Sequence, residues 1–149
     1  MSLKQTIFSD MKEAMKAGDA MKRDTLRMLD SMIKNTEIDL KKREEGLSDS
    51  EAQDVISRAI KQRRDAMAQY TAAGRPELAE KETAEIEILM AYMPEQLSEE
   101  AVTAVVVAVI AEMGATKTDI GKVMGQAMAK LKGQVDGNLV KKIAEEKLQ

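Results

Sequence analysis

Four glycines divide most of this 149-residue chain into stretches whose apolar residues are spaced as in helices. Each follows such a stretch, at the place where a helix commonly ends in a left-handed residue; they are Gly18, Gly46, Gly74 and Gly114. Two starts are marked by capping boxes, Ser2 with Gln5 and Ser48 with Glu51. These signals for helix ends and helix starts predict a succession of short amphipathic helices.

The predicted helices form two groups on either side of "MPEQLS", where Pro94 should stop a helix. Four precede it: one ahead of Gly18, then 19 to about 45, 48 to about 73, and 77 to about 92. Three shorter helices follow, at about 99–113, 119–132 and 137–148. The sequence therefore predicts an all-α protein, with an N-terminal bundle of about four helices over residues 1–93 and a small three-helix domain over 94–149.

The stretch "VTAVVVAVI" is rich in β-branched residues and resembles a buried strand. The chain offers no second strand to pair with it, and a lone strand leaves its backbone hydrogen bonds unmade. We therefore predict a buried helix whose packing overrides its propensity.

The second predicted helix carries an apolar seam and a charged stripe. The seam repeats at steps of three and four and comprises Leu26, Leu29, Ile33, Thr36 and Leu40. The stripe comprises Arg23, Arg27, Asp30, Lys34, Glu37 and Lys41. We interpret the stripe as a solvated face with ion pairs. Each such pair would stabilise the helix by only about 0.2–0.5 kcal/mol.

Composition limits the chemistry that the chain can perform. Cysteine and histidine are both absent, which excludes disulfides, thiol catalysis, cysteine-ligated metal sites and Ser-His-Asp triads. No catalytic residue, metal site or cofactor is predicted. The net charge of −3 argues against nonspecific coating of nucleic acid, so an RNA contact requires a local basic patch. No segment resembles a signal peptide or spans a bilayer, and we expect a cytoplasmic protein with no membrane partner.

The tail "GKVMGQAMAKLKGQVDG" provides such a patch. Residues 115–142 contain six lysines and two aspartates, a local balance of +4. On the predicted helix, small residues and lysines lie opposite the apolar face. They could contact phosphates, or Gly121 and Gly125 could admit a neighbouring helix; spacing alone favours helix packing. The candidate RNA-binding residues are Lys117, Gly121, Lys122, Gly125, Lys130, Lys132, Gly133, Gly137 and Lys141.

A second basic cluster lies in "SRAIKQRRDA" and in the turn "AAGRPEL". It comprises Arg58, Lys61, Arg63, Arg64 and Arg75. An ion-pair network and a phosphate contact are both open interpretations. For Arg75, at the break between two helices, we expect Glu82 or Glu85 as the partner.

Two long segments together resemble the GatB/YqeY family: "KQRRDAMAQYTAAGRPELAEKETAEIEILMAYMPEQLSEE" and "DIGKVMGQAMAKLKGQVDGNLVKKIAEEKL". The resemblance implies a larger N-terminal helical part and a small C-terminal helical domain. In the GatB subunit of the tRNA-dependent amidotransferase, the related region is the C-terminal tail, which contacts tRNA.

The resemblance implies tRNA, and amidotransferase or other translation-related proteins, as partners. The activity attached to the family is that of a carbon–nitrogen ligase with glutamine as amido donor. Because the chain has no glutaminase nucleophile, we expect an accessory protein that binds tRNA near Gly121–Gly137 and has no active site of its own. The alternatives are a protein–protein adaptor without an RNA role and a carbon–nitrogen ligase that acts alone or within a complex.

Overall fold

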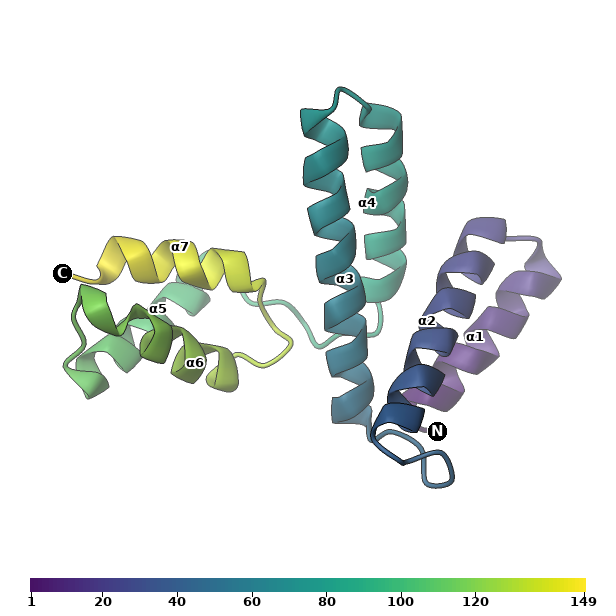
Figure 1. The fold of residues 1–149 in the computed structure, drawn as a ribbon, viewed down its shortest axis with the longest axis horizontal. Coiled ribbons are helices and arrows are strands. Elements are labelled where there is room, and N and C mark those ends of the chain that lie inside the picture. Colours follow the sequence, from purple (N-terminus) through teal and green to yellow (C-terminus); the bar gives the residue numbers. More distant parts are fainter. The chain divides into compact units, whose positions relative to one another are not determined.

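The computed structural model describes residues 1–149 and contains helices but no strand, which confirms the predicted all-α class (Figure 1). The helices are α1 (Leu3–Ala17), α2 (Ala20–Asp39), α3 (Asp49–Ala72), α4 (Pro76–Met90), α5 (Glu99–Met113), α6 (Ile120–Lys130) and α7 (Gly137–Lys147), with a 3₁₀ turn at Lys117–Asp119 ahead of α6. The chain forms two compact units, which we call the N-terminal unit (Met1–Met93) and the C-terminal unit (Pro94–Gln149).

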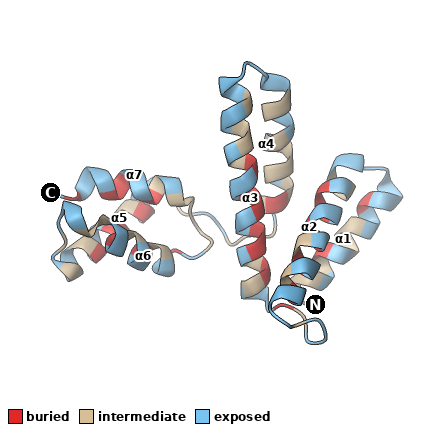
Figure 2. Ribbon diagram, viewed as in Figure 1, coloured by how far each residue is buried: buried red, intermediate tan, exposed pale blue.

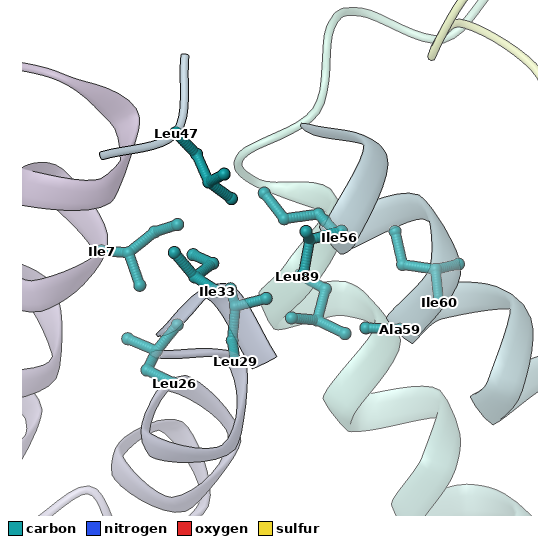
Figure 3. Close-up of a cluster of buried hydrophobic side chains, with 10 residues drawn as sticks. Ile7, Leu26, Leu29, Ile33, Leu47, Ile56, Ala59, Ile60 and Leu89 are labelled. Atoms are coloured by element: carbon teal, nitrogen blue, oxygen red, sulfur yellow. The ribbon is translucent and has the colours of Figure 1, made fainter. Parts of the chain in front are cut away.

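The N-terminal unit consists of two helical hairpins, α1–α2 and α3–α4, with α2 packed against both α3 and α4. Buried positions follow the inward sides of these helices (Figure 2). Figure 3 shows apolar side chains from all four helices and from the α2–α3 loop gathered in one cluster. Its members are Ile7, Leu26, Leu29, Ile33, Leu47, Val55, Ile56, Ala59, Ile60 and Leu89. Burial of each large side chain stabilises the unit by roughly 1.5–3 kcal/mol.

The predicted helix starts are confirmed. The Ser2 hydroxyl accepts the Gln5 N–H at 3.2 Å, and the Ser48 hydroxyl accepts the Glu51 N–H at 3.1 Å. Both capping boxes are complete, and Pro76 opens α4 at a position whose N–H would have no helical partner. An ion pair with Lys42, together with the hydrogen bonds from Ser48, lowers the pKa of Glu51 to about 2.

The second helix ends earlier than predicted, at Asp39 rather than near residue 45. Lys41 adopts a left-handed conformation with φ 58°, and the Lys42 N–H donates to the Glu37 carbonyl at 2.7 Å. These bonds close the helix as a Schellman motif, with lysine in the place where glycine is usual. Gly46, with φ 77°, therefore lies in the following loop and does not cap the helix.

The side chains near this end also differ from expectation. Leu40, placed in the predicted seam, is 49% exposed. Asp30 and Glu37, placed in the predicted solvated stripe, are buried at 7% and 4% exposure. Each has a lysine partner: Lys34 lies 2.8 Å from Asp30, and Lys4 of α1 pairs with Glu37. The predicted ion pairs are therefore present, but the prediction of a solvated face is wrong at Asp30 and Glu37, because the buried side of α2 is wider than the apolar seam and includes both positions.

The C-terminal unit packs α5, α6 and α7 around one apolar core. The β-branched stretch is helical, as predicted, and places Val102, Val106 and Val109 in that core. The other buried members are Val123, Ala127, Leu131, Val140, Ile143, Ala144 and Leu148. Backbone hydrogen bonds tie each end of the unit to an internal turn, from Leu97 N–H to the Gln134 carbonyl between α6 and α7 at 2.9 Å and from Lys117 N–H in the 3₁₀ turn to the Gln149 carbonyl at 3.3 Å.

No single helix has the length and apolar composition needed to cross a bilayer. Only the pair formed by Glu99–Met113 and Lys117–Lys130 meets these limits when taken together, and it is bent by 111° at the break.

Candidate nucleic-acid interface

The exposed side of α6 carries a line of small residues. Gly121, Gly125 and Ala129 are four residues apart and all exposed, opposite the buried Val123 and Ala127. Ala129 is not among the predicted contact residues, although its spacing from Gly125 is the signal that identifies it. A Cβ atom added at Gly121 or Gly125 would meet no atom within 4 Å. The line is therefore open, and no helix of the C-terminal unit packs against it.

This finding overturns the favoured interpretation of Gly121 and Gly125 as a helix-packing pair. Neither has a positive φ, so the backbone does not require glycine there either. Glycine inside a helix is less favourable than alanine by about 0.8–1.0 kcal/mol. The fold of the C-terminal unit thus gives no reason for two glycines on this surface.

Substitution of the two glycines tests whether the fold requires them. We expect Gly121→Ala and Gly125→Ala each to stabilise the C-terminal unit by up to about 1 kcal/mol, because alanine fits the open space and favours the helix. Thermal unfolding followed by far-ultraviolet circular dichroism measures the change. Gly114→Ala is the matched control and should lower the melting temperature, since Gly114 ends α5 with φ 60°. A lower melting temperature for Gly125→Ala would contradict the open surface.

Lysines accompany the small residues. We call the exposed residues on and directly after α6 the α6 surface; they are Gly121, Lys122, Gly125, Gln126, Ala129, Lys130 and Lys132. The helix itself contains no acidic residue. Lys130 reaches Glu112 of α5 at 3.3 Å, in a pair that is about half exposed and therefore weak. Lys122 takes part in no ion pair, so its charge is available to an external anion.

The remaining tail candidates lie outside this surface. Lys117 is exposed in the 3₁₀ turn ahead of α6, and Lys141 is exposed on α7. Gly133 is half-buried with φ 75°, and its carbonyl accepts the Gln96 side-chain N–H at 2.7 Å. Gly137 opens α7, and an added Cβ there would be 3.8 Å from Met128 Cε. The positive φ explains why residue 133 is glycine without any ligand.

The second basic cluster does not form one surface. Arg63 is only 5% exposed and donates from Nε to Glu85 at 3.0 Å and from Nη1 to the Ala59 carbonyl at 2.9 Å. Its Nη2 lies 3.4 Å from Met28 Sδ. A guanidinium held in this way joins helices and cannot reach a phosphate outside. Arg63 is therefore removed from the candidate RNA contacts.

The other members of that cluster are scattered. Arg58 and Lys61 are exposed on α3, and Arg64 is partly buried. Arg75 pairs with Glu77 at 2.6 Å, not with Glu82 or Glu85 as predicted. The reason is local: Arg75 directly precedes α4, and Glu77 lies in the first turn of that helix. Both side chains of the pair are more than half exposed, so it adds little stability.

Comparison with known proteins gives one family and several relatives. The family model described as Yqey-like protein matches residues 4–148. The relatives include proteins named "Altered inheritance of mitochondria protein 41, mitochondrial" from several yeasts. The one from Candida glabrata is 37% identical over 90 residues, covering 60% of this chain and 49% of the relative. Those from Eremothecium gossypii and Kluyveromyces lactis are 38% and 41% identical over 84 and 83 residues, each covering 56% of this chain and 45% and 44% of the relative.

These matches correct one expectation and confirm another. The relatives are named as mitochondrial proteins, which overturns the expectation of a cytoplasmic protein. The chain spans about half the length of the curated relatives it matches. The resemblance seen in the two long sequence segments is confirmed, because the family match runs over nearly the whole chain. The chain belongs to the YqeY-like protein family.

Proposed function

We propose that this protein binds tRNA through the α6 surface, as an accessory protein related to tRNA-dependent amidation and without an active site of its own. One observation carries the proposal. Exposed glycines that the fold does not require lie in line on α6, beside a lysine that has no ion-pair partner.

The charge of Lys122 and the open space at the two glycines both favour binding of a nucleic-acid backbone. A lysine ammonium neutralises a phosphate and releases a condensed counterion, which is the main source of sequence-independent affinity for nucleic acid. Any side chain at Gly121 and Gly125, even the methyl group of alanine, would hold a sugar–phosphate backbone farther from the helix and from Lys122. A ligand that must approach closely therefore explains glycines that otherwise weaken the helix by about 1 kcal/mol each.

The accessory role follows from the residues that the chain lacks. With neither cysteine nor histidine, it has no thiol to attack glutamine and no imidazole base. The resemblance to the tRNA-contacting tail of an amidotransferase subunit supports a role in holding the tRNA. A ligase activity would then belong to a partner protein.

A protein–protein adaptor is the second candidate, and one observation favours it. Ile38 and Leu40 are 52% and 49% exposed at the end of α2, next to the charged loop that leads to α3. Two large exposed apolar side chains close together in the sequence suit a protein partner better than RNA.

The experiment that separates these candidates is binding of labelled tRNA to the full chain, measured by fluorescence anisotropy across a salt series. We expect the logarithm of the affinity to fall linearly with the logarithm of salt concentration, with a slope of about −0.9 for each phosphate contacted. Three contacts give roughly a 40-fold loss between about 50 and 200 mM salt. Absence of binding at the lowest salt would overturn the proposal and leave the adaptor.

A further inference from the structure

The C-terminal unit lacks two kinds of side chain that often contact RNA, arginine and aromatic residues. Its only cations are lysines: Lys117, Lys122, Lys130, Lys132, Lys141, Lys142 and Lys147. All arginines of the chain lie at or before Arg75, and its aromatic residues are Phe8, Tyr70 and Tyr92. The unit that carries the α6 surface therefore contains no arginine and no aromatic ring.

This composition decides which features of RNA the surface can read. Proteins hold single-stranded bases by stacking them on aromatic rings or on the planar guanidinium of arginine. A lysine ammonium is a compact point charge that suits a phosphate and offers no plane for stacking. Side chains cannot read the bases of an RNA duplex through its deep, narrow major groove, so proteins recognise the duplex mostly by its shape, phosphates and 2′-hydroxyls. The lysines of the α6 surface are thus suited to the phosphate backbone, and Gln126 is its one side chain with an amide that could hydrogen-bond a base.

We infer that the C-terminal unit recognises double-helical RNA through its phosphates, independently of base sequence, and discriminates against single strands. The inference rests on the proposed function and specifies its ligand. A duplex presents phosphates at high density in a fixed arrangement, so lysines gain counterion release without having to order the RNA. A single strand has a lower charge density and must be ordered, and here no stacking offsets that ordering.

The test uses the full chain with two duplexes of about 16 base pairs and unrelated sequences, an unstructured oligouridine of the same length, and tRNA as the reference ligand. We expect the duplexes to bind within about twofold of each other and at least about tenfold more tightly than oligouridine. Equal or tighter binding of oligouridine, or a tenfold difference in affinity between the two duplexes, would overturn the inference. Binding of tRNA in the same experiment would still support the proposed function. Failure of every RNA, tRNA included, refutes the proposed function itself.

A gain-of-function variant sharpens the test. Gln126 is exposed on α6, and Gln126→Tyr adds a ring to the α6 surface without changing its charge. We expect this variant to bind oligouridine about tenfold more tightly and the duplexes within about twofold of the parent, because only unpaired bases can stack on the ring. An equal gain for the duplexes would contradict the inference.

Discussion

Replacing Lys122, Lys130 and Lys132 together with glutamate is expected to lower the affinity for tRNA by at least about 100-fold at low salt. Three cations on the α6 surface become three anions, so counterion release is lost and phosphates are repelled. The salt dependence should flatten in parallel, by about 0.9 in slope for each phosphate contact removed. Anisotropy with labelled tRNA measures both quantities, and far-ultraviolet circular dichroism confirms that the helices remain.

A matched control distinguishes an effect of the α6 surface on binding from an effect of the net charge of the whole chain. Lys12, Lys16 and Lys81 are exposed in the N-terminal unit, and their joint replacement with glutamate changes the net charge by the same amount. Lys12 lies over the Phe8 ring at 4.4 Å and Lys16 is 3.7 Å from Glu13, both weak surface contacts. We expect tRNA affinity to stay within about threefold of the parent. A loss as large as that of the α6 variant would show that total charge, not the α6 surface, controls binding.

Arg63→Ala is expected to destabilise the N-terminal unit by about 3–5 kcal/mol, the largest stability effect that we predict. The guanidinium joins α3 to α4 through Glu85 and contacts Met28 of α2. Its loss leaves Glu85, whose side chain is only 17% exposed, without a cation. Burial and the charge of Glu85 already raise the pKa of Glu82, so the neighbourhood tolerates the loss of a positive charge poorly.

Urea unfolding followed by tyrosine fluorescence measures this effect. Tyr70 and Tyr92 both lie in the N-terminal unit and the chain has no tryptophan, so the signal reports that unit alone. Arg75→Ala breaks the exposed pair with Glu77 and should cost less than about 1 kcal/mol. Equal losses for Arg63→Ala and Arg75→Ala would contradict the buried role. Arg63→Met combined with Glu85→Leu should recover much of the loss, because no unpaired charge then remains.

Local signals in the sequence predicted the helix starts well. A capping box joins residues three positions apart, so Ser2 with Gln5 and Ser48 with Glu51 can be recognised without knowing the fold. The end of α2 was missed because Lys41 adopts the left-handed conformation that the sequence rules assign to glycine. A single lysine in this conformation leaves no mark in composition or periodicity.

For the candidate site too, the sequence predicted one part and the tertiary structure decided the other. Helical spacing alone placed Gly121, Lys122 and Gly125 on one side of α6, opposite its apolar residues. Spacing could not show whether a neighbouring helix covers that side, and it favoured the wrong answer. Whether a side of a helix is open depends on where the other helices lie, and therefore on contacts between residues distant in sequence.

By itself, the sequence determined the helical class, the helix starts, the chemistry that is excluded and the family, because these depend on residue types and short spacings. Only the tertiary structure decided which charges are buried and which glycines are open. Arg63 and Lys122 both appear as basic residues on predicted helices, yet one is enclosed between helices and the other faces outward. The difference arises because burial depends on the packing of several helices together, which no local pattern of charge and spacing encodes.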